Sequence, residues 1–483
     1  MKFLPGTNYS FGLLLFAFCL AVPAGRPSAS ELPDLGEAAR ATVSEASEAR
    51  LGREIMRQIR GDKDFLDDPE ITDYLNALGE RLAAASPSPG RQFEFFAVRD
   101  PLINAFALPG GFIGVHTGLI SAAGDESELA GVLAHEIAHV TQNHIARIVD
   151  SQKGSALTTL AALAVAILAS RSDNAQLAQA AVTTAQALAM QSQLDYTRDH
   201  EREADRVGLQ TLGSAGYAPA GMVSFFERLQ TQGRLYENKA PAYLRTHPLT
   251  HDRMADLQNR LAETAYRQHL DSIEFALVRA KVKAAEGDAG DALKRFAALA
   301  ELHDDPSALY ALTASALRAG DRARARETFT RLEKKIASPM VESLGIQVLL
   351  ENAQADLALT RSQNALSRYP AYKPLAYVHA RLLLRLGKAT DARAFVTRQL
   401  GLWPEEPRLY RLLAEVNLAL GRRAEGHLAQ AEAHLRQDQP SLAMEQLLLV
   451  RSVGDGDFYA LSVADARLRE LRQRELEEQK AKP

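Results

Sequence analysis

Apolar residues recur at helical spacing along most of this 483-residue chain. Leu75, Leu78 and Leu82 keep that spacing, and residues 32–60 show a similar helical pattern. In residues 93–98 an alternation of apolar side chains replaces it and predicts a strand. The pattern therefore predicts a mainly α-helical protein with a small mixed β-sheet.

A turn rich in proline and glycine interrupts the next apolar stretch, residues 104–115. Pro109-Gly110-Gly111 is expected to join two short strands. A strand that meets a proline belongs at the edge of a sheet, because proline cannot donate a hydrogen bond to a neighbouring strand. Such an edge could pair with an extended peptide by strand addition, although an ordinary hairpin fits the spacing equally well.

The second half of the chain repeats a pattern of helix pairs. A spacing close to 34 residues is typical of tetratricopeptide repeats, and turn-forming glycines follow it here, although the repeat near residue 353 lacks its glycine. We expect residues 269–475 to form an α-solenoid of five or six helix pairs with a concave binding face, followed by a charged tail at 476–483. A generic helical bundle is the alternative. The glycines are Gly287, Gly320, Gly387, Gly421 and Gly454.

The first residues have the pattern of a targeting segment. Residues 11–22 form an apolar run that Pro23 ends, which predicts an export signal peptide in residues 1–30. An uncleaved membrane anchor is the alternative. The one cysteine of the chain, Cys19, lies inside this run. A mature chain would therefore contain no cysteine, and any metal must be held by histidine, aspartate or glutamate.

One motif, His-Glu-Ile-Ala-His beginning at His135, carries candidate chemistry. On a helix, His135 and His139 share one face, where their imidazoles could hold a zinc ion with Glu136 beside it as general base. Asp125 and Glu128 have the spacing of an N-cap with its capping box, which predicts where this helix begins. The bare motif arises by chance in roughly one chain in a hundred of this size, so a third ligand is needed.

A later segment places two carboxylates on one helical stripe. Glu201 and Asp205 lie on a stripe that is otherwise small and apolar, while Glu203 points to another face. Acids on an inward face need compensation, which a zinc ion and its histidine ligands would supply. We predict that Glu201 is the third ligand and that Asp205 accepts a hydrogen bond from the free ring nitrogen of a ligand histidine. Glu203 is the alternative ligand. Three ligands leave one position open to water, which indicates a catalytic site.

Taken together, these segments resemble a known family. The stretch Asn104-Ala-Phe-Ala-Leu-Pro-Gly-Gly, the His-Glu-Ile-Ala-His helix and the later acidic pair are similar to gluzincin zinc metallopeptidases of the HtpX and CAAX-prenyl-endopeptidase type. The closest likeness is the BepA-like periplasmic branch with C-terminal tetratricopeptide repeats. The resemblance covers about residues 40–265 and implies a zincin-like peptidase domain in residues 31–268. It implies one zinc ion held by His135, His139 and Glu201, with Glu136 as the catalytic glutamate.

A second match concerns the segment Thr246-His247-Pro248, since the family keeps a similar His-Pro motif near its site. The resemblance implies that His247 approaches the zinc, where it would either occupy the open position at rest or stabilise the oxyanion. An exposed loop histidine is the alternative. We expect His144, His200 and His251 to be surface residues.

By resemblance, the function is that of a periplasmic zinc endopeptidase, partly chaperone-like, that acts on misfolded or stalled outer-membrane proteins. The repeats would dock substrate or the outer-membrane assembly machinery. A non-proteolytic scaffold with a vestigial metal site is the alternative. Residues 155–169, short and apolar, could be a core helix, a cover over the site or a peripheral membrane contact. The net charge of -4 argues against a nucleic-acid partner.

Overall fold

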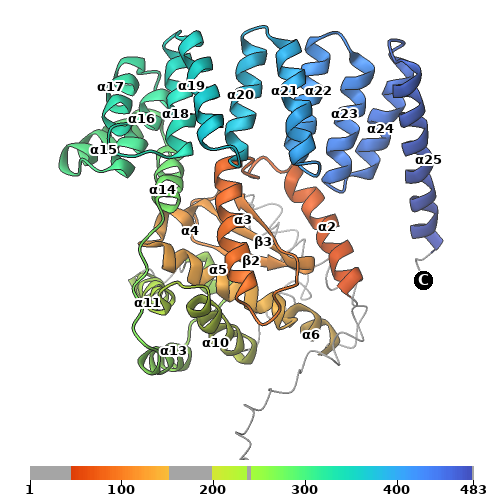
Figure 1. The fold of residues 1–483 in the computed structure, drawn as a ribbon. Coiled ribbons are helices and arrows are strands. Elements are labelled where there is room, and N and C mark those ends of the chain that lie inside the picture. Colours follow the sequence, from red (N-terminus) through yellow and green to blue (C-terminus); the bar gives the residue numbers. More distant parts are fainter. Residues whose placement is uncertain (1–44, 152–197, 236–240, 481–483) are drawn as a thin grey trace, which may run out of the picture.

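The computed structural model describes residues 45–151, 198–235 and 241–480. They form a helical N-terminal part around a small sheet, and a solenoid of helix pairs that lies across it (Figure 1). The elements of the N-terminal part are α2 (Glu45–Gly61), α3 (Pro69–Ala84), β1 (Glu94–Val98), β2 (Ala105–Leu108), η1 (Pro109–Gly111), β3 (Phe112–His116), α4 (Thr117–Ala122), α5 (Glu126–Thr141), α6 (His144–Ser151), α10 (Arg198–Ser214), α11 (Pro219–Leu235), α12 (Ala242–Thr246) and α13 (His251–Glu263).

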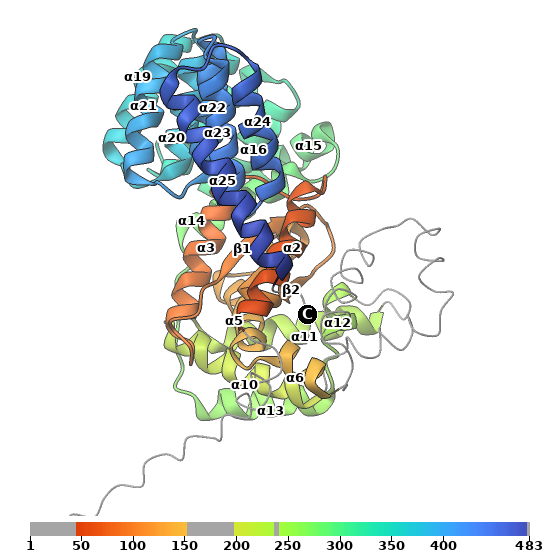
Figure 2. The ribbon, with the colours of Figure 1, turned by 90° about the vertical axis from the view of Figure 1, so that its right-hand side faces the viewer.

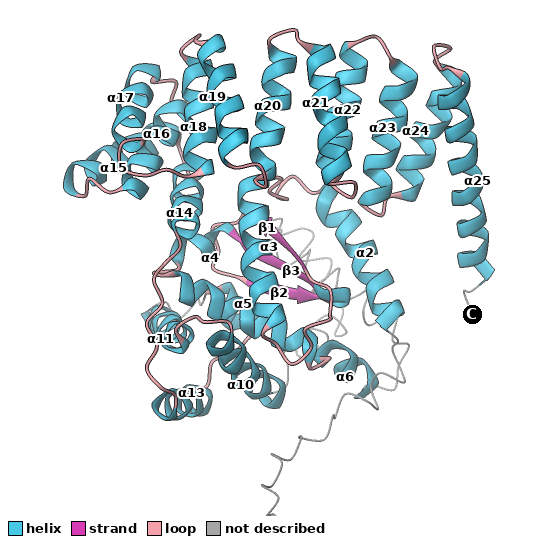
Figure 3. Ribbon diagram, in the orientation of Figure 1, coloured by secondary structure: helices cyan, strands magenta, loops and turns pink. Residues whose placement is uncertain are grey.

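The sheet is small and mixed, as predicted. Its strand order is β1-β3-β2, with β3 parallel to β1 and antiparallel to β2 (Figure 3). The turn η1 joins β2 to β3, and its Gly110 and Gly111 have φ angles of 80° and 85°, which glycine adopts without strain. The strand before the proline, β2, therefore lies at a sheet edge, as expected from the sequence.

Both faces of the sheet are covered by helices. Phe96 and Phe106 point to one side, where they pack with Met56 of α2. Phe95 and Ile113 point to the other side and join the larger core with α3 and α5. Because successive strand residues point to opposite faces, nearly every strand residue is buried.

Helix α5, which carries the His-Glu-Ile-Ala-His motif, lies at the centre of the N-terminal part. The Asp125 side chain accepts a hydrogen bond from the backbone N–H of Glu128 at 2.9 Å, so the helix begins where the capping pattern predicts. Every residue of α5 is buried. Helix α10 packs closely against it, because a Cβ atom at Gly208 would lie only 3.1 Å from the Cα atom of His135. This close approach brings the acidic stripe of α10 opposite the motif.

The solenoid consists of six consecutive helix pairs between residues 273 and 480. Its turn glycines at 287, 320, 387, 421 and 454 all have positive φ angles. Where the glycine is missing, Ala353 adopts the same left-handed conformation with a φ of 58°, so the repeat is kept. The helices are α14 (Ile273–Ala285), α15 (Ala289–Leu302), α16 (Pro306–Arg318), α17 (Arg322–Leu332), α18 (Pro339–Glu351), α19 (Ala355–Arg368), α20 (Lys373–Arg385), α21 (Ala389–Leu402), α22 (Pro407–Ala419), α23 (Arg423–Arg436), α24 (Pro440–Ser452) and α25 (Phe458–Lys480).

The solenoid contacts the N-terminal part at several places along its length (Figures 1 and 2). Near its start, Lys281 of α14 forms ion pairs of 2.6 Å with Asp68 and 2.8 Å with Glu70, at the beginning of α3. Further along, Arg408 of α22 pairs with Asp67 at 2.6 Å. These contacts join the start of α3 and the residues just before it to the first and the fifth helix pairs of the solenoid.

Several expectations fall on residues outside the described ranges, namely the signal peptide at 1–30, the start of the first predicted helix, and the apolar segment at 155–169. Within the described ranges, none of the helices has both the length and the apolar character that a bilayer crossing requires. Helix α25 continues to Lys480, through the first residues of the charged tail.

Candidate metal centre

Four side chains from three parts of the chain meet in the interior. His135 and His139 come from α5, Glu201 from α10, and His247 from the residue that ends α12. One candidate ligand atom from each lies within 4.8 Å of all the others, and all four residues are buried. His247 is 2% exposed, so the alternative of an exposed loop histidine is wrong.

The donor atoms of this group have the spacing that a zinc site needs. The two Nε2 atoms of His135 and His139 are 2.9 Å apart. The carboxylate oxygens of Glu201 lie 3.6 Å and 3.4 Å from those two nitrogens. Four ligands placed tetrahedrally about 2.0–2.1 Å from a zinc ion are separated from each other by about 3.3 Å. The imidazole and carboxylate donors therefore fit zinc both in kind and in distance.

Asp205 and Arg253 support this group from behind. The Nδ1 atom of His135 lies 3.1 Å from Oδ1 of Asp205, on the side of the ring opposite its Nε2 atom. Arg253 contacts Asp205 through two hydrogen bonds of 2.7 Å and forms a 2.7 Å ion pair with Glu201. The buried carboxylates are thus compensated by a guanidinium that is itself only 2% exposed. No role is predicted for Arg253 from the sequence, because no local pattern separates a buried arginine from one at the surface.

Glu136 is a buried acid beside the cluster. Neither of its carboxylate oxygens has a side-chain hydrogen-bond partner among the described residues, and a backbone contact from Ala107 of β2 lowers its pKa slightly. Burial raises the pKa of Glu136, and the neighbouring His247 and His135 oppose that rise. The Oε1 atom of Glu136 lies 3.6 Å from Nε2 of His247. An unengaged carboxylate of this kind is available to take a proton from a bound water molecule.

The electrostatics of Glu201 differ from those of Glu136. Burial alone would raise the pKa of Glu201, but His247, followed by His135 and His139, lowers it well below its usual range. Glu201 is therefore an anion in the absence of any metal. The site therefore holds Glu201 ionised and favours protonation of Glu136. A metal ligand needs the first property, and a residue that carries a proton needs the second.

His144 and His200 are not surface residues, which corrects the expectation from the sequence. The chain turns at Asn143, whose φ is 53°, and returns the His144 ring to the buried side of α5. The Nδ1 atom of His144 lies 2.8 Å from Nδ1 of His139, and the His200 ring stacks on His144 with centroids 4.5 Å apart. His251 is exposed, as expected.

Glu203 faces away from the cluster, as its place on α10 predicts. Its Oε2 atom lies 3.2 Å from Nε2 of His144 and accepts a 2.7 Å hydrogen bond from Arg147. Burial opposes ionisation of Glu203, but these two contacts hold its pKa at about 2. Glu203 is not among the four residues of the cluster.

Comparison with known proteins places this site in a family. The model of peptidase family M48 matches residues 69–261. A putative beta-barrel assembly-enhancing protease of Vibrio cholerae is 34% identical over 443 residues, which cover 89% of this chain and 90% of that protein. The beta-barrel assembly-enhancing protease of Escherichia coli K12 is 32% identical over 459 residues, or 93% of each chain.

More distant similarity covers smaller parts of the chain. The mitochondrial metalloendopeptidase OMA1 of Arabidopsis thaliana is 31% identical over 222 residues, which cover 46% of this chain and 42% of that protein. Among solved structures, the tetratricopeptide-repeat protein YrrB covers 35% of this chain at 15% identity and a TM-score of 0.28.

The resemblance first seen in the motifs is confirmed by relatives that match both the N-terminal part and the solenoid. The family model spans all four residues of the cluster, whose donors fit the zinc ion that the family uses. The chain therefore belongs to peptidase family M48 and is a zinc metalloendopeptidase.

Proposed function

We propose that this protein works in the periplasm as an endopeptidase for misfolded or stalled β-barrel outer-membrane proteins. The names of relatives that this chain matches over about nine-tenths of their length support this substrate class. The observation that carries the proteolytic role is the carboxylate of Glu136, buried and without a side-chain hydrogen bond among the described residues, beside a cluster of metal-binding donors. A scaffold with a vestigial site would have no use for that arrangement.

We assign the parts of the chain as follows. Residues 1–30 are the signal peptide, 31–268 the peptidase domain, 269–475 the repeat domain and 476–483 the charged tail. The boundary near residue 268 is supported by the positions of α13, which ends at Glu263, and α14, which begins at Ile273.

In this proposal the zinc ligands are Nε2 of His135, Nε2 of His139 and the carboxylate of Glu201. Asp205 accepts a hydrogen bond from Nδ1 of His135, which fixes the ring with Nε2 toward the ion. Bound zinc supplies a Lewis acid that acidifies water and polarises the peptide carbonyl. The ionised state of Glu201 means that this ligand is ready to bind without first losing a proton.

Glu136 carries the proton in the reaction. Its carboxylate takes a proton from the attacking water and returns it to the nitrogen of the leaving amine. The raised pKa of Glu136 suits the first step, because the conjugate base of a weaker acid takes a proton more readily. No covalent bond between enzyme and substrate is required.

We propose that His247 occupies the fourth position when no substrate is present. Its Nδ1 atom lies 3.0 Å from Oε1 of Glu201, and its ring stacks on Tyr243 with centroids 4.6 Å apart. In this place the imidazole is within reach of any ion held by the other three residues. Substrate must displace the ring, after which the same imidazole is well placed to stabilise the oxyanion.

The edge strand β2 is the proposed place where substrate lies. It packs directly against α5, so a peptide paired with β2 would pass beside Glu136. Main-chain pairing of this kind tolerates many side chains, which suits an enzyme for unfolded proteins.

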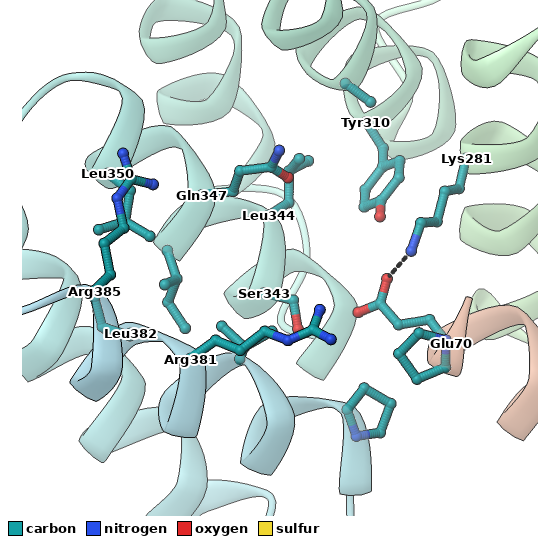
Figure 4. A pocket seen from close by; sticks show the side chains of 15 residues that line it. Glu70, Lys281, Tyr310, Ser343, Leu344, Gln347, Leu350, Arg381, Leu382 and Arg385 are labelled. Atoms are coloured by element: carbon teal, nitrogen blue, oxygen red, sulfur yellow. Dashed lines mark hydrogen bonds and ion pairs between the residues drawn. The ribbon is translucent and has the colours of Figure 1, made fainter. Parts of the chain in front are cut away.

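The repeats are proposed to dock substrate or the assembly machinery. A pocket of about 340 Å³ lies between α3 and the inner helices of the solenoid (Figure 4). Its floor includes the apolar side chains of Leu344 and Leu382, and Arg381 lies at its exposed side. The Oε1 atom of Glu70 and the hydroxyl of Ser343 in its wall are buried without a hydrogen-bond partner among the described residues. An unfolded segment could place an apolar side chain against the two leucines and offer its backbone polar groups to Glu70 and Ser343. Holding such segments without cutting them is the basis of the proposed chaperone-like behaviour.

The substrate class can be tested with purified protein that carries zinc. A β-barrel outer-membrane protein diluted from urea should be cleaved, whereas the same barrel folded in detergent should resist cleavage. The Glu136→Gln variant serves as the matched control for contaminating proteases. Failure to cut the unfolded barrel, while an unfolded soluble protein is cut, would overturn the proposed substrate class but leave the zinc peptidase intact.

A further inference from the structure

The two histidines of the motif are held in different ways. The Nδ1 atom of His135 lies 3.1 Å from Oδ1 of Asp205, with no other side chain between the ring and this carboxylate. The Nδ1 atom of His139 instead lies 2.8 Å from Nδ1 of His144. The nearest carboxylate beyond His144 is that of Glu203, whose Oε2 atom lies 3.2 Å from Nε2 of His144. A second imidazole is thus inserted between ring and carboxylate.

The short distance between two Nδ1 atoms restricts the protonation of both rings. Only one of the two nitrogens can carry the shared proton. If His139 uses Nε2 toward the metal, its Nδ1 atom carries the hydrogen and donates it, so Nδ1 of His144 must accept. His144 is then protonated on Nε2, from which it donates to Glu203. This assignment of tautomers satisfies every contact in the row formed by His139, His144 and Glu203.

The surroundings hold this row in place. His144 is fully buried, and its ring lies between His139 and the stacked ring of His200. Arg147 donates a 2.7 Å hydrogen bond to Glu203, which fixes the carboxylate as the terminal acceptor. The left-handed conformation of Asn143 is what turns His144 back toward α5.

We infer that His144 and Glu203 are positioning residues for the second metal-binding histidine. His144 accepts the Nδ1–H of His139 through a neutral imidazole, and Glu203 selects the tautomer of His144 that can do so. This inference rests on the proposed ligand role of His139. Groups that orient a ligand histidine typically change metal affinity by about 10–100-fold when they are removed.

The test compares two substitutions of similar size on the full mature chain. His144→Leu removes the acceptor, whereas His144→Asn places a side-chain oxygen close to the lost Nδ1 atom. Zinc affinity is measured by competition with a chromophoric chelator. The zinc-bound tautomer of His139 is read from the nitrogen shifts of its ring in NMR spectra. Asp256→Asn, which breaks an exposed ion pair with Arg206, is the matched control in the same domain.

We expect His144→Leu to weaken zinc binding by about tenfold or more, His144→Asn to restore most of that loss, and Asp256→Asn to change nothing. Equal affinities for the leucine and asparagine variants would overturn the inference, because packing rather than the acceptor would then be at work. If His144→Leu does not fold, Glu203→Ala decides, since it must weaken zinc binding several-fold. Unaltered affinity in that variant would also overturn the inference. A parent chain that binds no zinc would instead contradict the proposed function itself.

Discussion

Arg253 donates two hydrogen bonds of 2.7 Å to Asp205, one from Nε and one from Nη2, and both residues are buried. The same guanidinium pairs with Glu201, so one cation compensates two carboxylates at the back of the metal centre. The guanidinium binds the carboxylate of Asp205 through two hydrogen bonds at once. Lysine, whose ammonium is a single point charge, could not make this bidentate contact.

Removing this cation should therefore unfold the peptidase part more easily. We expect Arg253→Met to lower the free energy of unfolding by about 3–5 kcal/mol, because it leaves buried charges without a partner. Arg253→Lys should recover only part of the loss. The measurement is chemical denaturation of the zinc-free chain. Arg206→Met, which removes an exposed partner of Asp256, should cost about 1 kcal/mol or less, and an equal cost for the two arginines would contradict this account.

Much of this centre follows from patterns that depend on regular helices. The grouping of His135 with His139, and of Glu201 with Asp205, was predictable because residues four apart share a helical face. The first helix turn at Asp125 and the period of the glycine turns follow from equally local rules. These features need no knowledge of how distant segments meet.

Other parts of the centre depend on breaks in regular structure or on burial. On an uninterrupted helix, His144 would point away from His139, and only the turn at Asn143 reverses it. Asparagine adopts positive φ more readily than most residues, so Asn143 is a signal for this turn. The signal is weak, because most asparagines do not adopt positive φ. Arg253 and Tyr243 carry no local signal, because their burial is decided by the packing of α10, α12 and α13 together.

Removal of the His247 ring should open the site. If that imidazole covers the metal centre about nine-tenths of the time, His247→Ala should raise cleavage of an unfolded substrate by up to about tenfold, less the part that loss of the ring's contact with the oxyanion removes. A decrease would show that stabilisation of the oxyanion is the larger role. Unchanged cleavage together with unchanged zinc coordination, as seen by X-ray absorption, would remove His247 from the site.

The seat of α3 against the solenoid should respond to pH through Asp73. Burial is the main cause that raises the pKa of Asp73 to about 6; Glu406 and Glu70 contribute to the rise, and Lys373 and Arg408 oppose it. A carboxyl whose pKa is higher in the folded state holds its proton more tightly there, so stability falls as pH rises from about 4 to about 6. Asp73→Asn should match the parent near pH 4 and become more stable than the parent above pH 6. A difference in melting temperature that does not change with pH would refute this.

The turn at residue 353 should be improved by the glycine it lacks. Ala353 is exposed and has a φ of 58°, so its side chain pays a conformational cost without making a buried contact. We expect Ala353→Gly to stabilise the solenoid by about 0.5–1 kcal/mol.

The reverse change in the preceding repeat provides the control. Gly320 has a φ of 75° and open space where a Cβ atom would lie. Gly320→Ala should therefore destabilise the solenoid by about 1–2 kcal/mol through backbone strain alone. Denaturant titrations of both variants give these values, and a destabilised Ala353→Gly chain would show that the turn is set by something other than its φ angle.

We propose that Glu136 moves the proton in a site where His135, His139 and Glu201 hold zinc. It is tested most directly by measuring bound zinc and peptide cleavage on the same preparations of the parent and of Glu136→Gln. We predict one zinc ion per chain in both, with cleavage reduced by about 10²–10⁴-fold in the variant. A parent chain that holds no zinc, or a variant that cleaves as fast as the parent, would contradict the account.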